Sequence, residues 1–441
     1  RKCAREWVRM KNIGIAGFGT VGQGFYNQIK RFYKDINIVQ IAIKNPKKKR
    51  KVNLKKIKLT SKVQDLAFNP DIEVLIECIG GSSGSAYKLV KAALSNKKHI
   101  ITANKALLAI HGNELIKIAK KNNVTINYEA AIAGGIPVVK AIRENLKYNN
   151  ISKVYGILNG TCNYILSKME REGKDFLSVL KDAQKLGFAE IDPLFDIKGI
   201  DAAHKITLLS SLAFDIPIKF SQTYTEGIDK IELDDFRFAS EFGYKIKLLG
   251  IAERKQDSYE QRVHPCLIRE DSEVAKVDNE LNAVVINDEM VGKTVLIGPG
   301  AGGKPTGAAI VADLLDLKRG NLNSPLGESI LSSKKIKNIN ILNSNFAYYL
   351  KIVVKDEVGV MRRISDILAR NKISIDQQKQ EHSNKRGYAT IVIITHIIKE
   401  KIVLKAIKEI NNMKRINNKL KFIRIEGKLW VISVKSTQLA F

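Results

Sequence analysis

The sequence predicts an α/β protein, with a doubly wound parallel sheet near the N-terminus, a mixed α/β block in the middle and a small ferredoxin-like unit near the C-terminus. Apolar segments alternate with helical patterns over residues 11–128, as is typical of buried parallel strands and their crossover helices. A glycine-rich turn, GFGTVG, directly follows the first apolar segment. Residues 346–428 follow the order strand, helix, strand, strand, helix, strand, which is that of a ferredoxin-like fold.

The N-terminal unit is predicted from its strand segments and from the turn that joins the first strand to the first helix. The strand segments are 11–16, 36–43, 73–80, 98–104 and 123–130. The turn supplies a GxGxxG motif through Gly17, Gly19 and Gly22, which permits a tight bend and the close approach of a pyrophosphate to free helix N–H groups. A dinucleotide site is therefore predicted here. Its expected cofactor contacts are Gly17, Phe18, Gly19, Thr20, Val21 and Gly22.

The residues after the second predicted strand bear on the choice of cofactor. An NAD-specific site places an acidic residue there, but this chain has Ile43-Lys44-Asn45-Pro46. Lys44 and the lysines behind it suit a 2′-phosphate, so NADP(H) is the expected cofactor and NAD(H) the alternative. PKKKRKV at 46–52 resembles a nuclear import signal. A phosphate-facing loop or a solvated face explains the same residues, and we do not expect import.

Composition narrows the class of protein and its compartment. The net charge is +29, but Lys, Ile and Asn are frequent throughout, which indicates a general bias, and we expect no nucleic-acid partner. The four cysteines lie far apart without a CxxC pair, which indicates neither a disulfide framework nor a zinc site. No apolar run reaches the length of a membrane span, and no apolar core follows the basic N-terminus, in which Met10 could be the natural start. We therefore expect a cytoplasmic protein without membrane contact.

The segment 187–205, GFAEIDPLFDIKGIDAAHK, carries residues suited to acid–base chemistry. Asp201 and Lys205 stand four residues apart, so on a helix they share one face and can pair. A lysine held beside carboxylates in a cleft suits a general acid, because burial and neighbouring charges can bring the pKa of a lysine toward neutrality. By spacing alone, however, a solvated helix face explains the pair better.

Several motifs together resemble the homoserine dehydrogenase family. They are TANK at 102–105, GILNGTCNYIL at 156–166, LGFAEIDPLFDIKGIDAAHK at 186–205 and GPGAGG at 298–303. The unit that begins at Phe346 resembles the ACT domain of many members. The motifs occur in the family's order over nearly the whole chain. No aspartate-kinase segment precedes them, so the monofunctional form is expected.

The resemblance implies a division of the chain into functional parts. Residues 11–130 would form a Rossmann-type NAD(P)-binding domain, with the helix 303–318 packed back onto it. Residues 131–302 would form the catalytic and dimerisation domain, 319–345 a linker, and 346–428 the ACT regulatory domain. A homodimer or homotetramer is expected, and the ACT domain suggests feedback control by an amino acid, with threonine as the expected effector.

The resemblance also implies an activity, the reversible reduction of L-aspartate 4-semialdehyde to L-homoserine by NAD(P)H in threonine, methionine and isoleucine biosynthesis. Lys205 would give a proton to the developing alkoxide, and Asp201 would orient the substrate and act on Lys205. Lys105 would contact cofactor and substrate, and a neighbouring cation is expected to lower its pKa. Glu190 would bind the substrate ammonium, and Asp196 would support the same polar wall.

Further contacts follow from the same resemblance. The expected additional cofactor contacts are Lys44, Gly81, Lys105 and Gly302. A monovalent cation, expected to be sodium, would be held mostly by backbone carbonyls at Glu129, Ile132, Gly134 and Ile136. His204, beside Lys205, is expected to be structural.

The chain departs from the family pattern at three places. Cys162 replaces the second Thr of NGTTNY, Lys304 replaces an apolar residue after GPGAGG, and the turn DEVG at 356–359 lacks a frequent proline. The last change puts amino-acid binding by the ACT domain in question. Lys304 lies toward the expected nicotinamide end, where its charge could change cofactor affinity.

Two other functions compete with the dehydrogenase interpretation. One is a basic, amino-acid-sensing regulatory protein on a dehydrogenase scaffold, but such a scaffold has no need to retain Lys105, Glu190, Asp201 and Lys205 together. The other is a different semialdehyde or hydroxy-acid dehydrogenase. The absence of a nucleophilic cysteine in an active-site motif argues against acylating aldehyde oxidation.

Overall fold

The computed structural model describes residues 11–45, 52–54, 56–146, 150–322, 336–383, 385–413, 416 and 418–427. The import-like segment apart from Val52, residues 323–335 of the predicted linker, and Met10 lie outside the described residues. The chain forms two compact units. The first is built from the described residues of Arg1–Ile231, Leu248–His264 and Val277–Asn338, and the second from those of Glu232–Lys247, Pro265–Lys276 and Ile339–Phe441.

The first unit contains a six-stranded parallel sheet. Its strands are β1 (Asn12–Ala16), β2 (Asn37–Ala42), β3 (Lys58–Thr60), β4 (Val74–Glu77), β5 (His99–Thr102) and β6 (Ile126–Asn127). They lie in the order β3-β2-β1-β4-β5-β6, and each neighbouring pair is parallel, which confirms the predicted doubly wound, Rossmann-type sheet.

Two details of this sheet differ from the sequence prediction. β3 was not predicted, because its three residues come from the basic segment, residues 44–62, and are not fully buried, as an edge strand permits. β6 is shorter than the predicted strand 123–130, because Glu129–Ala131 turns into a short 3₁₀ helix. The sheet therefore ends just before Glu129, whose backbone N–H donates to Asp313 Oδ2 at 2.9 Å.

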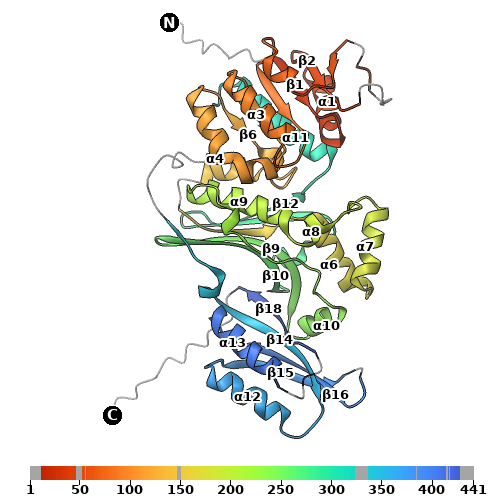
Figure 1. Cartoon of the computed structure of the whole chain (residues 1–441), viewed down its shortest axis with the longest axis vertical. Helices are drawn as coiled ribbons and strands as arrows, with labels where there is room; N and C mark the ends of the chain where they lie inside the picture. The colour runs from red at the N-terminus through yellow and green to blue at the C-terminus, as the bar shows by residue number, and fades with distance from the viewer. Residues whose placement is uncertain are drawn as a thin grey trace. The chain divides into compact units, whose positions relative to one another are not determined.

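Helices connect and cover the strands of this sheet. They are α1 (Thr20–Phe32), α2 (Asp65–Phe68), α3 (Ser85–Ser95) and α4 (Lys105–Lys121), joined by the distant α11 (Gly303–Lys318). A Cβ at Gly24 would lie 1.9 Å from the Gly303 carbonyl oxygen. The backbones of α1 and α11 are therefore so close at this point that only glycine fits at position 24. Ile310, Leu314 and Leu317 of α11 join the core beneath the sheet. Figure 1 shows α11, in teal, among the red and orange N-terminal elements.

A second sheet and its helices complete the first unit. The strands lie in the order β12 (Gly292–Pro299), β11 (Leu281–Asp288), β7 (Ile151–Ile157), β9 (Tyr244–Lys255) and β10 (Ser258–Arg269), and the last residues of β10 and the first of β9 belong to the second unit. The remaining elements are α5 (Val138–Lys140), a π-helical turn (Ala141–Leu146), α6 (Gly160–Glu172), α7 (Phe176–Lys185), α8 (Leu194–Ile197), α9 (Ile200–Phe214), a 3₁₀ turn (Phe220–Gln222), β8 (Tyr224–Thr225) and β13 (Lys337–Asn338). Residues 201–214 of α9 are all buried, and this helix contacts both α4 and β7.

The second unit has the predicted ferredoxin-like order. Its elements are β14 (Asn345–Lys355), α12 (Val360–Arg370), β15 (Ile375–His382), β16 (Tyr388–Thr395), β17 (Ile398–Lys399), α13 (Glu400–Asn411) and β18 (Lys421–Glu426), together with α10 (Leu233–Glu241) and short 3₁₀ turns at Val274–Lys276 and Ile341–Asn343. The order β18-β14-β16-β15 is antiparallel throughout. Arg424 and Glu400, both buried, form an ion pair at 2.6 Å that ties β18 to α13.

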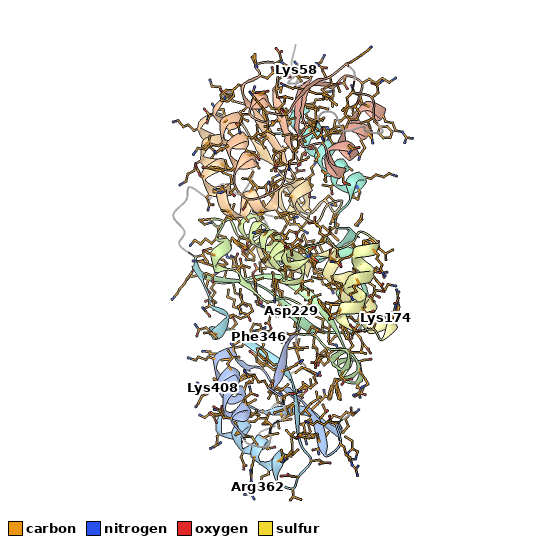
Figure 2. All side chains as sticks on the ribbon, turned by 45° about the vertical axis from the view of Figure 1, so that its right-hand side comes forward. Lys58, Lys174, Asp229, Phe346, Arg362 and Lys408 are labelled. Atoms are coloured by element: carbon orange, nitrogen blue, oxygen red, sulfur yellow. The ribbon has the colours of Figure 1, made fainter. Side chains whose placement is uncertain are left out.

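Basic side chains lie on the surfaces of both units. Figure 2 labels Lys58 and Lys174 in the first unit and Arg362 and Lys408 in the second, and all four are accessible to solvent. Among the described helices, none combines the length and the hydropathy that crossing a membrane requires.

Candidate active site

Asp201 holds the ammonium groups of two lysines in the first unit. Its Oδ2 lies 2.7 Å from Lys205 Nζ, and its Oδ1 lies 2.9 Å from Lys105 Nζ. Lys205 Nζ also donates to the Leu158 carbonyl oxygen at 2.7 Å. The structure thus brings three predicted catalytic residues into one cluster.

Local sequence explains how the cluster forms. Asp201 and Lys205 are neighbours on the first turns of α9, which begins after Gly199 at φ +78°. Because α9 is buried along its length, the pair lies in the interior, and the solvated-face explanation of its spacing is wrong. Lys105 is the first residue of α4, where Asn104 caps the helix by accepting the Leu107 N–H at 3.0 Å.

Asn159 joins this cluster to Asp196. Its Nδ2 donates to Asp196 Oδ1 at 2.8 Å and to Asp201 Oδ2 at 2.9 Å. Its Oδ1 accepts the Cys162 N–H at 2.8 Å and so caps α6. Asn159 and the Leu158 carbonyl were not among the predicted site residues, although both lie within GILNGTCNYIL. An Asn before a glycine at a helix start was the available signal for the cap.

The charges of the cluster shift the pKa values of its members. Burial alone would raise the pKa of Asp201, but Lys205 and Lys105 hold it well below the usual range. The charge of Asp201 raises the pKa of Lys105 despite burial, so the expectation that a neighbouring cation lowers it is wrong. Burial, followed by the charge of Asp201, raises the pKa of Asp196. Lys105 and Asp201 therefore stabilise each other in their charged forms.

Other predicted residues surround the cluster at different depths. Glu190 is exposed on the loop before α8, and its negative charge contributes to the raised pKa of Lys105. His204 is buried between the rings of Phe195 and Phe220, with ring centroids 5.4 and 4.3 Å away, and burial lowers its pKa to about 4. The Cys162 thiol donates to the Asp196 carbonyl oxygen at 3.2 Å, a bond that the replaced threonine could also make.

The glycine turn has the shape that a dinucleotide requires. Gly17 has φ +90°, and a Cβ there would lie 2.5 Å from the Cys78 carbonyl oxygen. A Cβ at Gly22 would lie 2.3 Å from the Gly17 carbonyl oxygen, whereas one at Gly19 would enter open space. Gly19 is the N-cap of α1 and has no side chain to accept the first helix N–H groups. These residues, with Phe18, Thr20 and Val21, fit a pyrophosphate.

The other predicted cofactor contacts lie at the ends of loops. Lys44 is exposed two residues after the end of β2, as a 2′-phosphate contact requires. Gly81 follows β4 at φ +82°, and Gly302 precedes α11 at φ +116°. Lys304 is exposed, and its carbonyl oxygen accepts from Gln28 Nε2 at 2.9 Å.

The predicted cation site is a turn around a buried carboxylate. The two oxygens of Glu129 accept the N–H groups of Val139 and Lys140, each at 2.9 Å. Burial raises the pKa of Glu129 to about 7. Ile132 and Ile136 are buried, and Gly134 has φ +52°. Burial and the charge of Glu129 raise the pKa of the neighbouring Asp313 to about 8.

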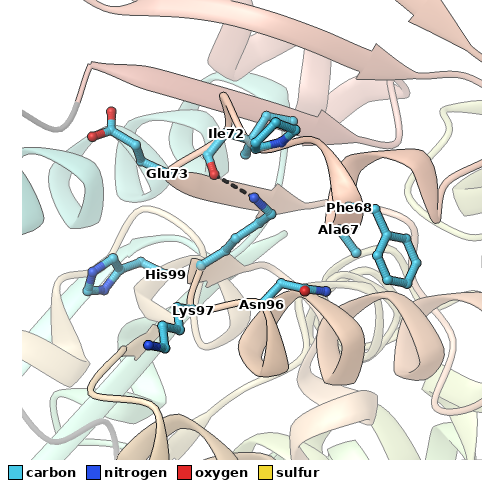
Figure 3. Close-up of a pocket in the computed structure, with 9 residues that line it drawn as sticks. Ala67, Phe68, Ile72, Glu73, Asn96, Lys97 and His99 are labelled. Carbon is cyan, nitrogen blue, oxygen red and sulfur yellow. Dashed lines mark hydrogen bonds between the residues drawn. The ribbon is translucent and has the colours of Figure 1, made fainter.

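A separate pocket of about 500 Å³ lies at the opposite edge of the parallel sheet. It is lined by Phe68, Glu73 and His99, among others, at the amino ends of β4 and β5 (Figure 3). There the Lys98 ammonium donates to the Ile72 carbonyl oxygen at 2.8 Å and to that of Asn69 at 2.6 Å. Dinucleotides bind at the carboxyl ends of such strands, so this pocket is not the cofactor site.

Comparisons with known proteins agree with this geometry. Residues 137–315 match the family model for homoserine dehydrogenase, 17–129 its NAD binding domain, and 350–417 an AHAS small subunit-like ACT domain. The homoserine dehydrogenase of Pseudomonas aeruginosa is 41% identical over 431 residues, which cover 94% of this chain and 98% of that protein.

Solved structures give the same result. A homoserine dehydrogenase from Thiobacillus denitrificans superposes with a TM-score of 0.87 at 39% identity, covering 94% of this chain and 98% of that one. A hyperthermophilic archaeal homoserine dehydrogenase in complex with NADPH has a TM-score of 0.60 at 26% identity and covers 69% of this chain and 97% of its own. The chain therefore belongs to the homoserine dehydrogenase family, whose members are NAD(P)-dependent oxidoreductases that act on a CH–OH group.

Proposed function

We propose that the chain catalyses the reversible NAD(P)H-dependent reduction of L-aspartate 4-semialdehyde to L-homoserine. The observation that carries this proposal is the buried Asp201 carboxylate between the ammonium groups of Lys105 and Lys205. Two fixed cations suit a reaction in which negative charge develops on a carbonyl oxygen. The glycine turn of the same unit fits the dinucleotide that such a reduction needs.

Lys205 and Lys105 have different roles in the proposed reaction. The bound nicotinamide supplies or accepts the hydride. An ammonium group has three N–H donors. Lys205 directs one to Leu158 and one to Asp201, so the third is left to give a proton to the substrate oxygen. Lys105, whose side chain is 33% exposed, contacts substrate and cofactor and adds a second positive charge. After that donation Lys205 is a neutral amine, and in the oxidation of homoserine this neutral amine takes the hydroxyl proton and becomes an ammonium group again.

The carboxylates position the substrate and the lysines. Asp201 holds both lysines in place through ion pairs, and Asn159 donates to its Oδ2. Glu190 is exposed and close enough to act on Lys105, which suits binding of the substrate ammonium. Asp196 extends the same polar wall through Asn159.

Cofactor preference is assigned to NADP(H), with NAD(H) as the alternative. Lys44 is exposed after β2, where the 2′-phosphate would lie, and the archaeal relative was solved with NADPH.

We also assign a sodium ion to the turn at Glu129, Ile132, Gly134 and Ile136, because a nearby cation would stabilise the buried Glu129 carboxylate. The second unit is proposed to bind an amino-acid effector, with threonine as the first to test. We further propose a cytoplasmic homodimer or homotetramer that works in threonine, methionine and isoleucine biosynthesis without a nucleic-acid partner.

The first experiment measures initial rates of L-homoserine oxidation at the nicotinamide absorbance, with NADP⁺ and with NAD⁺, with and without threonine. Turnover is expected and should fall by at least about 100-fold in Lys205→Ala. The matched control is Lys198→Ala, because Lys198 also pairs with an aspartate, Asp229, at 2.9 Å but at the surface. A folded protein without turnover, or a Lys205→Ala variant as active as Lys198→Ala, would contradict the proposal.

A second experiment tests the cofactor assignment. Lys44→Glu should weaken NADPH binding by about 10-fold and leave NADH binding unchanged, because only NADPH carries the 2′-phosphate. Lys62→Glu makes the same charge change at another exposed lysine of the basic segment and should affect neither cofactor. Equal effects of both variants would assign the change to general electrostatics.

A further inference from the structure

Glu77 is a fully buried carboxylate at the carboxyl edge of the parallel sheet. It is the last residue of β4, in register with Ala16 of β1 and Thr102 of β5. The strand order reverses between β1 and β4, and this crevice is where doubly wound folds bind their ligands. Glu77 therefore lies directly beneath the cofactor region without reaching the surface.

The carboxylate is bound by donors from two different loops. Its Oε1 accepts the N–H groups of Ile79 at 2.8 Å and Gly80 at 3.2 Å, both in the loop that follows β4. Its Oε2 accepts the Thr102 hydroxyl at 2.5 Å, at the end of β5. Burial raises the pKa of Glu77, while these hydrogen bonds oppose that shift. Because both oxygens of this buried carboxylate accept hydrogen bonds, Glu77 fixes the position of the loop after β4 relative to the end of β5.

Asn104 makes a second connection between the same loops. Its Nδ2 donates to the Gly81 carbonyl oxygen at 2.8 Å, its N–H donates to Thr102 Oγ1 at 2.9 Å, and its Oδ1 caps α4. The next residue is Lys105, which pairs with Asp201. The loop that carries Gly81 and the turn that carries Lys105 are thus linked through two buried side chains.

We propose that Glu77 is a positioning residue that couples the cofactor-facing loop 79–81 to the turn that places Lys105. When a bound cofactor reduces the motion of the loop, the hydrogen bonds of Glu77 also reduce the motion of the first turn of α4, through Thr102 and Asn104. This inference rests on the proposed dinucleotide site, and it assigns Glu77 no contact with substrate or cofactor.

The test measures hydrogen exchange by mass spectrometry, with and without NADPH, together with the NADPH dissociation constant from fluorescence titration. In the wild-type chain, NADPH should slow exchange both in residues 79–84 and in residues 104–108. In Glu77→Met, which removes the acceptors, the dissociation constant should rise by about 10-fold. NADPH should then still slow exchange in 79–84 but no longer in 104–108. Glu77→Gln, which keeps an acceptor for Ile79 and Gly80, should restore most of the second effect.

A matched control lies on the same strand segment. Glu73 Oε2 accepts the N–H groups of Lys11 and Asn12, each at 2.9 Å, at the amino end of β4, so Glu73→Gln should leave NADPH binding unchanged. If Glu77→Met does not fold, Asn104→Ser replaces it, because serine can keep the helix cap but cannot reach Gly81. It should show the same loss of protection in 104–108.

Two results would overturn the inference. One is a wild-type chain in which NADPH leaves 104–108 unaffected. The other is a Glu77→Met variant that melts at a lower temperature but keeps the full NADPH-dependent protection of 104–108, which would make Glu77 a purely structural residue. Because the readout is cofactor binding, a chain that binds NADPH without oxidising homoserine would refute the proposed function and leave this inference standing.

Discussion

Replacing Asp201 by Asn tests whether one buried carboxylate holds the two lysines. Asp201 is 4% exposed, and its oxygens lie 2.7 Å from Lys205 Nζ and 2.9 Å from Lys105 Nζ. At an effective dielectric constant of about 20, unit charges at such distances attract by about 6 kcal/mol before desolvation is counted. Removing one partner of a buried pair costs about 3–5 kcal/mol. We therefore expect Asp201→Asn to lower the free energy of unfolding by about 3 kcal/mol.

The same change should also alter activity. Without Asp201, the principal cause of the raised pKa of Lys105 disappears, so the alkaline limb of the pH–rate profile should move to lower pH. We expect kcat/KM for homoserine to fall by about 1,000-fold, because the proton donor and the second cation are both displaced. The assays are urea unfolding and initial rates across pH.

A surface ion pair provides the control for both measurements. Asp229→Asn breaks the pair between Asp229 and Lys198, whose side chains are 31% and 50% exposed, and should cost less than about 1 kcal/mol. If Asp201→Asn is no less stable than Asp229→Asn and keeps more than about a tenth of wild-type kcat/KM, the reasoning about the cluster is refuted.

The remaining predictions concern His204, Asn159 and Gly24. Burial lowers the pKa of His204 from 6.5 to about 4. Between pH 6.5 and 4, this imidazole therefore binds a proton more readily in the unfolded chain than in the folded one. The free energy of unfolding should accordingly fall as the pH falls from 6.5 to 4. His204→Phe should lose that part of the slope in urea unfolding series, and an unchanged slope would exclude His204 as its source. Asn159→Ser should keep the cap of α6 but remove the hydrogen bonds to Asp196 and Asp201. We expect kcat to fall by about 10- to 100-fold while the melting temperature changes little. A large loss of stability with normal kcat would contradict this prediction. Gly24→Ala should reduce the free energy of unfolding by about 1–3 kcal/mol, because its Cβ would lie 1.9 Å from the Gly303 carbonyl oxygen, and a neutral effect in calorimetry would show that α1 and α11 can separate.

Local pattern was sufficient for the parts of this protein that depend on short stretches of chain. Apolar segments with intervening helical patterns identified the parallel sheet, and GFGTVG in its strand–helix context identified the turn at Gly17. The strand–helix order of residues 346–428 identified the ferredoxin-like unit. The edge strand Lys58–Thr60 was missed, because an edge strand needs few buried residues and so leaves little apolar signal.

The chemistry of the site depended on tertiary structure. Sequence spacing placed Asp201 and Lys205 on one helix face, but only the burial of α9 distinguished an interior cluster from a solvated one. The raised pKa of Lys105 could not be read from the chain, because Asp201, the carboxylate that causes it, is far away in sequence. Asn159 and the Leu158 carbonyl joined the site for the same reason, since their partners come from a later helix. The sequence by itself therefore determined the architecture and predicted candidate site residues, whereas the partners of these residues and the pKa shifts of Asp201 and Lys105 were decided by packing, because burial and distance set the energy of a charge.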